Sequence, residues 1–436
     1  MPRVGMVGGG QLARMTHQSA IALGQSLRVL SIGADESAAL VVTDLEIGSH
    51  LDLDALTRFA RGCEVVTFDH EHVPTEHVRA LVAAGHTVYP GAEALQYAQD
   101  KALMRTRLSE AGLPVPPFRI LEPGQGSGQA IAPTGLAAAV TDFGDSNGWP
   151  VVLKTARGGY DGRGVWVLNR GDLAAQLGAE PTGTLLLESF VPMRRELAAV
   201  VARSPFGQAA AWPVVETVQQ NGICVQVIAP APDLDADRAA AATRLALRIA
   251  GDLDVVGVLA VELFETEISA AAPDGLLINE LAMRPHNSGH WSMDGALTSQ
   301  FEQHLRAVLD YPLGRTDALA PFTVMANVLG GERAGTGTGE GSDQELGMDE
   351  RLHHLAARFP QVKIHLYGKA FRPGRKLGHV NVLGSDLTEL RRVAELAAGF
   401  LGNGFWDDGY SSDTGVAPPE DDSPAHRSVI TEGGST

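Results

Sequence analysis

Cysteine and long apolar runs are scarce in this sequence. Among 436 residues only Cys63 and Cys224 occur, each within an apolar stretch. Two cysteines cannot form a disulfide framework, so a reducing compartment is favoured and both thiols are expected in the core. No run approaches the length of a transmembrane helix, and no cleavable apolar segment follows Met1. These absences predict a soluble, cytoplasmic protein without a membrane partner.

Positive charge is also in short supply. Lys and Arg number 34 against 52 Asp and Glu, which gives a formal net charge of -18. Phosphate backbones attract clustered basic residues, so nucleic acid is not expected as a partner. A chain of this length predicts two or three domains with sizeable cores.

Two acidic residues follow apolar, strand-like runs. Glu262 lies in the run 255–264, and Glu280 lies in Asn-Glu-Leu-Ala-Met-Arg-Pro-His-Asn-Ser-Gly-His-Trp at 279–291. Asp274-Gly275 between the runs is a hairpin turn signal, so we expect the two carboxylates on adjacent strands, where they form a magnesium site for a nucleotide phosphate. The alternative is a pair of solvated glutamates on an edge strand. The residues expected to hold an anion or polar substrate nearby are Arg284, His286, Asn287 and His290.

The first 92 residues alternate strand and helix patterns, which predicts a doubly wound domain. Gly8-Gly9-Gly10-Gln11-Leu12-Ala13 after the first strand is a GxGxxA variant of the dinucleotide fingerprint. Asp35-Glu36 after the second strand offers an acid to a ribose. An NAD(P) oxidoreductase is therefore one hypothesis. The segment 63–71 begins as a strand and ends in a charged cluster that includes Glu71.

A glycine-rich loop joins two predicted strands in the next part of the chain. The strand 149–154 ends in Lys154, and the loop 155–164 leads to the strand 165–168. Backbone N–H groups of such a loop can close over phosphates, although a purely structural glycine hairpin is the alternative. No Gly-Lys-Ser/Thr follows, so the loop is not a Walker motif. We expect a flexible insertion around 124–134.

The remaining segments suggest contacts to a nucleotide and to an acidic substrate. A hinge after the strand 184–188 suits an adenine edge, and Glu196 suits ribose hydroxyls. The basic cluster at 368–379, in so acidic a chain, predicts a phosphate-monoester or carboxylate site, the alternative being a solvated basic turn. From Asp407 onward Gly, Ser, Pro and acids dominate, which predicts a disordered tail.

Four motifs in order resemble the N5-carboxyaminoimidazole ribonucleotide synthase family, ATP-grasp enzymes of purine biosynthesis. They are Gly-x-Gly-Gln-Leu-x-Arg-Met at 8–15, Gly-Gly-Tyr-Asp-Gly-Arg-Gly at 158–164, the run at 279–291, and Arg-Pro-Gly-Arg-Lys-x-Gly-His at 372–379. The resemblance implies an α/β ATP-grasp fold. Its parts would be a Rossmann-like domain at 1–92, a small α+β lid domain at 93–183, a larger α+β catalytic domain at 184–406, and the acidic tail 407–436.

The resemblance also implies a reaction and its site residues. ATP, with Mg²⁺, bicarbonate and 5-aminoimidazole ribonucleotide would give ADP, phosphate and the N5-carbamate, in a homodimer. The ATP-binding residues would be Lys101, Lys154, Gly158, Gly159, Tyr160, Asp161, Gly162, Arg163, Gly164, Glu188, Ser189, Phe190, Val191, Glu196, Gln219, Asn279 and Glu280. The metal ligands would be Glu262 and Glu280. The catalytic residues would be Arg284, His286, Asn287, Lys369 and Arg375, and the substrate side would add Gln11, Leu12, Glu71 and Lys376.

Two positions depart from the family pattern. Gln219 stands where many relatives have His, and Phe-Asp-His-Glu at 68–71 replaces a Phe/Tyr-Glu-Phe-Glu pattern. Two further hypotheses stay open beside the oxidoreductase. One is another ATP-grasp ligase, such as a formate-dependent glycinamide ribonucleotide transformylase. The other is a non-catalytic nucleotide-binding regulator, in which Glu262 or Glu280 would be replaced.

Overall fold

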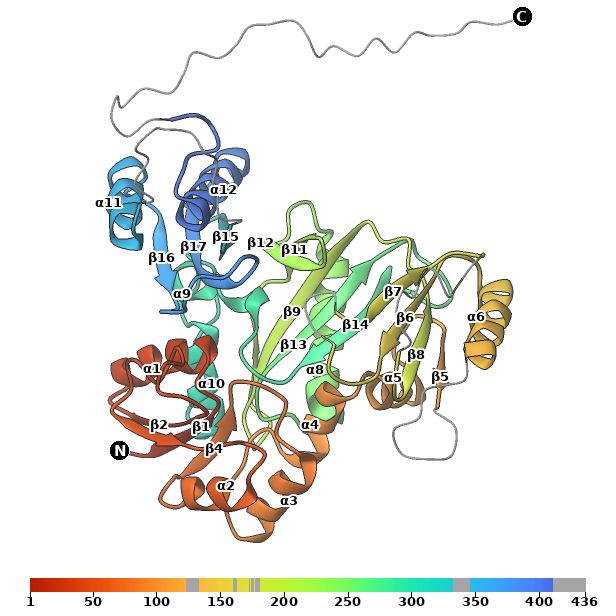
Figure 1. Ribbon diagram of the computed structural model, residues 1–436, viewed down its shortest axis with the longest axis horizontal. Helices are drawn as coiled ribbons and strands as arrows, with labels where there is room; N and C mark the ends of the chain where they lie inside the picture. Colours follow the sequence, from red (N-terminus) through yellow and green to blue (C-terminus); the bar gives the residue numbers. More distant parts are fainter. Residues whose placement is uncertain are drawn as a thin grey trace, which may run out of the picture.

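A computed structural model describes residues 1–122, 133–159, 163–171, 173, 176, 181–331 and 346–410. Tyr160, Asp161 and Gly162, most of the predicted insertion and the chain from 411 onward lie outside the described residues. Three sheets follow one another along the chain, from red through yellow and green to blue in Figure 1. Within the described ranges we find no helix with both the length and the apolar character needed to span a bilayer.

The first sheet is parallel and has helices on both faces, as the alternating pattern predicts. Its strand order is β3-β2-β1-β4. The strands are β1 (Arg3–Val7), β2 (Ser26–Ser31), β3 (Asp44–Ile47) and β4 (Val65–Phe68), and the helices are α1 (Gln11–Ala22), α2 (Leu53–Ala60), α3 (Thr75–Ala83) and α4 (Ala92–Gln99). β4 is buried on both sides, which is typical of a strand covered by helices on either face.

The second sheet is antiparallel and forms the lid. Its strands β5 (Phe118–Leu121), β8 (Leu185–Ser189), β6 (Val151–Thr155) and β7 (Val165–Leu168) lie in that order. The helix α6 (Pro133–Asn147) shares an apolar core with this sheet, in which Val140, Phe143 and Leu187 are buried. The strands β6 and β7 form a hairpin whose loop contains the predicted glycine flap.

The third sheet has nine strands and carries most of the molecule's core. The order is β14-β13-β9-β11-β12-β15-β17-β16, with β10 paired to β9. The strands are β9 (Arg195–Arg203), β10 (Ala209–Ala211), β11 (Val215–Gln220), β12 (Ile223–Ala229), β13 (Gly257–Glu265), β14 (Leu276–Ala282), β15 (Phe322–Leu329), β16 (Lys363–Leu366) and β17 (Lys376–Gly384). The remaining helices are α5 (Lys101–Glu110), α8 (Ala236–Asp252), the 3-10 helix η1 (Asn287–Gly289), α9 (Ser292–Gly295), α10 (Gln300–Val308), α11 (Met348–Arg358) and α12 (Leu387–Asn403).

The boundaries between these parts differ from the predicted ones. β8 pairs with β5 and β6, so the lid extends to Ser189 instead of ending at 183. Met104 and Leu108 of α5 pack in the core of the large sheet, so this helix is not part of the lid. At the other end Arg358 pairs with Asp408 and its guanidinium lies 4.0 Å from the ring centre of Tyr410, so the ordered chain passes the predicted end at 406.

Arg105 is the buried charge that joins the lid to the large sheet. Its side chain has no exposed surface, and it donates to the carbonyl oxygens of Ile278 at 2.6 Å and Asn279 at 3.0 Å on β14. It also pairs with the carboxylate of Glu188 on β8. The three contacts fix α5 between β8 and β14, and they compensate a carboxylate that is itself buried.

We therefore expect Arg105→Met to destabilise the protein strongly. Removing one partner of a buried ion pair leaves an uncompensated charge, which costs about 3–5 kcal/mol. Urea unfolding followed by circular dichroism measures the change. Arg107→Met, a change on the same helix at a partly exposed position, is the matched control. Equal unfolding midpoints for the two variants would show that the Arg105 contacts contribute nothing to stability.

Candidate functional site

Two glutamates face each other across the hairpin of β13 and β14. Glu262 is paired in register with Glu280, and Gly275 at the turn has a φ of 69°, so the predicted hairpin is confirmed. The register shifts by one residue directly after Glu262. Such a bulge re-aims a side chain, and here Asn279 Nδ2 also comes within 3.4 Å of Glu262 Oε2. Asn279 and Glu280, which are consecutive on β14, thus both lie beside Glu262.

The electrostatics of this pair fit a divalent cation. Burial, with Glu280 and Glu196 nearby, raises the pKa of Glu262 to about 8. β14 is an edge strand of the sheet, as the alternative expects, but the side chains of Glu262 and Glu280 are 30% and 38% exposed, so neither is fully solvated. Among the described residues no group of three or more His, Cys, Asp or Glu could hold a metal ion. Mg²⁺ characteristically uses one or two carboxylates and takes its other oxygens from phosphates and water, which suits a pair.

Two lysines from separate elements lie near the acidic pair, and one of them contacts it directly. Lys101, at the start of α5, places Nζ 2.5 Å from Glu280 Oε1. Lys154, near the end of β6, places Nζ 2.7 Å from Glu188 Oε2 and 3.2 Å from Asn279 Oδ1. The backbone N–H of Lys101 donates to Ala156 O, which ties α5 to the base of the flap. Cationic groups suited to phosphates therefore lie beside carboxylates suited to a metal.

Glu188, predicted to line the adenine, has a buried side chain paired with two cations. Its side chain is 2 % exposed, and although burial alone would raise its pKa, Arg105 and Lys154 hold that pKa below the usual value. The carboxylate is therefore committed to these cations, and only the backbone of this residue is left for a base. Sequence reasoning also missed Arg105, although its position four residues after Lys101 places both on one helix face.

The hinge and the flap lie where β8 and the β6–β7 hairpin end. Phe190 is exposed beside Ser189 and Val191, so apolar surface and backbone groups are both accessible there. Thr155 N donates to Gly164 O, which closes the hairpin, and Gly164 takes a φ of 69° that only glycine adopts easily. The other described flap residues are Gly158, Gly159 and Arg163.

Glu196 and Gln219 lie on neighbouring strands of the large sheet, near the acidic pair. Burial raises the pKa of the Glu196 carboxyl, while a hydrogen bond from Gln219 opposes that shift. The charge of Glu196 in turn raises the pKa of Glu262. Both predicted nucleotide residues therefore belong to the same cluster.

The residues after β14 connect the acidic pair to the first domain. Arg284 Nε donates to Glu71 Oε2 at 2.6 Å, and Met283 N donates to Glu71 Oε1 at 3.2 Å. In the tautomer in which His286 Nδ1 accepts from Ser288 N, the ring proton is on Nε2, 3.3 Å from Glu262 Oε1. Burial, with help from Arg284, lowers the pKa of His286 to about 3, so the ring is a neutral donor.

Asn287 and the two cysteines complete this region. Asn287 lies beside Cys224, whose thiol donates to Gln226 O at 3.4 Å, and burial raises the pKa of Cys224 to about 12. Burial raises the pKa of Cys63 as well. Neither thiol is activated, as the sequence predicts for core cysteines.

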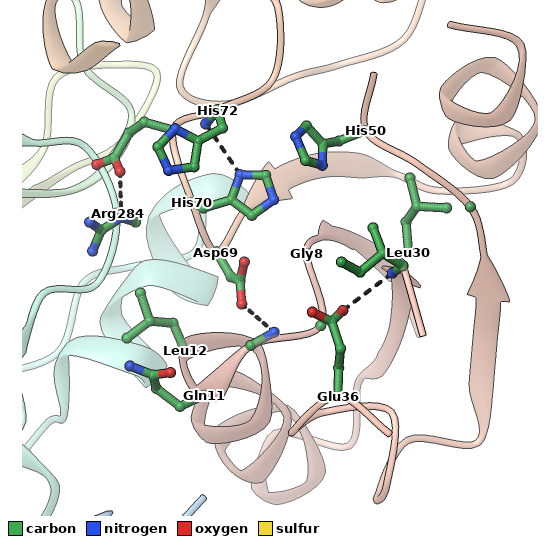
Figure 2. Close-up of a pocket in the computed structure, with 15 residues that line it drawn as sticks. Gly8, Gln11, Leu12, Leu30, Glu36, His50, Asp69, His70, His72 and Arg284 are labelled. Atoms are coloured by element: carbon green, nitrogen blue, oxygen red, sulfur yellow. Dashed lines mark hydrogen bonds and ion pairs between the residues drawn. The ribbon is translucent and has the colours of Figure 1, made fainter. Parts of the chain in front are cut away.

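Figure 2 shows a cavity of about 380 Å³ between the first domain and the loop that carries Arg284. Gly8, Leu12 and Glu71 line it, and so does Asp69. Asp69 Oδ2 accepts from Gly10 N at 2.6 Å, and burial raises the pKa of Asp69 to about 7. A dinucleotide fold uses this helix start for pyrophosphate. An internal carboxylate takes that place here, which speaks against the oxidoreductase hypothesis.

The basic cluster contacts Gln11, a residue that lines this cavity. Lys369 Nζ donates to Gln11 Oε1 across 358 residues of sequence. Burial, with Arg375 and Lys376 nearby, lowers the pKa of Lys369 to about 8. Lys369 is half-buried and desolvated, so it is not part of a solvated basic turn. Arg375 donates to Ala370 O at 3.1 Å.

Three family models match consecutive parts of the chain. The ribonucleotide synthetase preATP-grasp domain matches residues 1–99, the ATP-grasp domain matches 106–301, and the phosphoribosylaminoimidazole carboxylase C-terminal domain matches 323–393. The first match covers the first sheet, the second covers the lid sheet and strands β9 to β14 of the large sheet, and the third covers strands β15 to β17 of the large sheet. The matches confirm the predicted ATP-grasp fold with a preceding Rossmann-like domain.

Curated relatives and solved structures of high similarity identify one enzyme family. N5-carboxyaminoimidazole ribonucleotide synthase of Mycobacterium bovis is 56% identical over 427 residues, covering 96% of this chain and 93% of the relative, and that of Corynebacterium ammoniagenes is 46% identical over 415 residues, covering 94% and 95%. The Aspergillus clavatus enzyme in complex with ADP and 5-aminoimidazole ribonucleotide has a TM-score of 0.77 at 30% identity, covering 92% of this chain and 98% of that chain. The chain belongs to the N5-carboxyaminoimidazole ribonucleotide synthase family of ATP-grasp ligases.

Proposed function

We propose that this chain converts ATP, bicarbonate and 5-aminoimidazole ribonucleotide into ADP, phosphate and N5-carboxyaminoimidazole ribonucleotide. The observation that carries this proposal is the joining of two half-sites by one short loop. Glu262 and Glu280 form an acidic pair beside Lys101 and Lys154, and four residues after Glu280 the chain presents Arg284 to the first domain. ATP bound beside the acidic pair and bicarbonate bound beside Arg284 can thus react with each other, because one short segment of chain joins their binding residues.

The phosphoryl transfer needs positioning and charge compensation instead of a covalent nucleophile. Bicarbonate is a poor electrophile, and an oxygen of bicarbonate that attacks the γ-phosphorus displaces ADP and gives carboxyphosphate. Lys101 and Lys154 would bind ATP phosphates under the flap, and the hinge at 189–191 would hold the adenine. Glu262 and Glu280 would hold Mg²⁺, which when bound neutralises the charge that develops on the phosphate oxygens.

The carboxylation would follow in the cavity on the first-domain side. Carboxyphosphate releases phosphate and delivers its carbon to the amine of the ribonucleotide, which loses one proton. Arg284 and neutral His286 would hold the carboxylate oxygens of carboxyphosphate. Glu71 fixes the guanidinium of Arg284, and His286 directs its Nε2–H toward Glu262. Gln11, Leu12 and Asn287, with the cations Lys369, Arg375 and Lys376, would bind the ribonucleotide and its phosphate. We further propose a cytoplasmic homodimer, as the family resemblance suggests.

ADP formation with each co-substrate omitted in turn tests the reaction itself. We expect release to require bicarbonate and to be stimulated by aminoimidazole ribonucleotide, because carboxyphosphate forms only from the first and is consumed by the second. Formate replaces bicarbonate in the same assay to separate a formate-using ligase. ADP release that is indifferent to bicarbonate and to the ribonucleotide would refute the proposal.

Glu280→Gln tests the metal role of the acidic pair. The change removes one charge and leaves the shape, so we expect turnover to fall by about 100-fold or more, as when one electrostatic group of a transition state is lost. Glu280 is partly exposed, so the unfolding midpoint should change little. Glu267→Gln, on the exposed end of the same hairpin, is the control. Normal turnover of Glu280→Gln at low magnesium would remove Glu280 from the metal site.

The pKa of Lys369 predicts a pH dependence of ribonucleotide binding. With a pKa lowered to about 8, the side chain of Lys369 is positively charged below pH 8 and loses that charge as the pH rises through this value. We expect the KM for the ribonucleotide to rise by about tenfold per pH unit above pH 8, in step with the charged fraction. Steady-state kinetics from pH 7 to 9.5 measure this rise. Lys369→Arg, which stays charged, should flatten it, and a wild-type KM that is constant to pH 9.5 would contradict the assignment.

A further inference from the structure

Gln300, the first residue of α10, is fully buried and bonds three groups in the loop 284–290, hereafter the site loop. Its Oε1 accepts from His286 N at 2.8 Å. Its Nε2 donates to His286 O at 2.8 Å and lies 2.9 Å from His290 Nδ1. The loop also runs tightly against this amide, because a Cβ at Gly289 would lie 2.3 Å from Gln300 Oε1.

Only a primary amide can make this set of bonds. It accepts from the N–H and donates to the C=O of the same residue, as a neighbouring strand would, and it still has a second N–H for an imidazole nitrogen. A carboxylate would face two acceptors, His286 O and His290 Nδ1, and would lose both bonds. The main chain of His286 is therefore held from both sides by one side chain.

The helix that carries Gln300 is fixed independently of the site loop. Leu305 and Val308 pack in the core of the first domain with residues of β1 and β2. His304 Nδ1 accepts from Val258 N on β13, and its Nε2 lies 2.8 Å from Thr67 Oγ1 on β4. Because α10 is attached both to the strand that carries Glu262 and to the strand that precedes Glu71, its amide is a stable reference for both half-sites.

We propose that Gln300 is a positioning residue for the carboxylation chemistry. It holds the His286 backbone so that Nε2–H points toward Glu262 and the guanidinium of Arg284, two residues earlier, stays on Glu71. It does not contact the lysines of the nucleotide half-site. This inference rests on the proposed function, because it assigns the site loop to bicarbonate and carboxyphosphate.

The same helix offers a matched control. Gln303 is also fully buried, and it clamps Gly314 in the same way, with Nε2 donating to Gly314 O and Oε1 accepting from Gly314 N, each at 2.8 Å. That loop carries none of the residues assigned to substrates. Gln303→Glu therefore imposes a similar loss of amide bonds on α10 without touching the site loop.

The experiment compares Gln300→Glu with Gln303→Glu in the full chain, by steady-state kinetics for each substrate and by thermal unfolding. For Gln300→Glu we expect kcat to fall about 10- to 100-fold, since displacements near 1 Å cost about that much. The KM for bicarbonate should rise while the KM for ATP stays within about twofold. Gln303→Glu should keep kcat and every KM within about twofold of wild type.

Equal losses of kcat in the two variants, or a Gln300→Glu enzyme with wild-type kcat and KM for bicarbonate, would overturn the inference. Should Gln300→Glu fail to fold, Gly289→Ala decides in its place, because the added methyl group displaces the amide without removing it. A kcat reduced about tenfold with an unchanged KM for ATP supports the inference, and wild-type kinetics refute it. Failure of the proposed function itself is separate, since it appears in the wild-type enzyme as ADP release without bicarbonate.

Discussion

The site depends on four charged side chains that three separate parts of the fold bring together. Glu262 and Glu280 come from one hairpin, Lys101 from the helix α5, and Lys154 from the lid strand β6. Burial, with Glu280 and Glu196 nearby, raises the pKa of Glu262 to about 8, so a cation bound at this pair would favour the ionised carboxylate. Triphosphate with Mg²⁺, as proposed for this site, would supply opposite charges to both the lysines and the glutamates.

Much of this arrangement follows from local sequence patterns. Asp274-Gly275 between two apolar runs predicts the hairpin, and the hairpin places Glu262 opposite Glu280. The glycine-rich loop beside Lys154 is likewise a local signal, since few residues other than glycine accept a positive φ at Gly158 and Gly164. The parallel first sheet follows from alternating strand and helix patterns, because each strand must be covered on both faces.

Other features depend on partners distant in sequence and could not be predicted. The buried guanidinium of Arg105 donates a hydrogen bond to Ile278 O, 173 residues away, and no local sequence pattern indicates that contact. β8 belongs to the lid because it pairs with β5 and β6, although its sequence resembles any apolar strand. The glycine-rich turn at 8–10 resembles a dinucleotide site, yet Asp69 from another strand already accepts the helix N–H. Strand pairing and long-range burial, more than local secondary-structure propensity, determine these three features.

We propose that bicarbonate, otherwise inert, becomes reactive by receiving a phosphoryl group between the acidic pair and the site loop. Bicarbonate labelled with ¹⁸O tests this directly. When a bicarbonate oxygen attacks the γ-phosphorus, that oxygen stays with phosphorus after the carbon has left. Mass spectrometry of the phosphate product should therefore find one ¹⁸O per turnover. Phosphate without label, while N5-carboxyaminoimidazole ribonucleotide accumulates, would contradict the account.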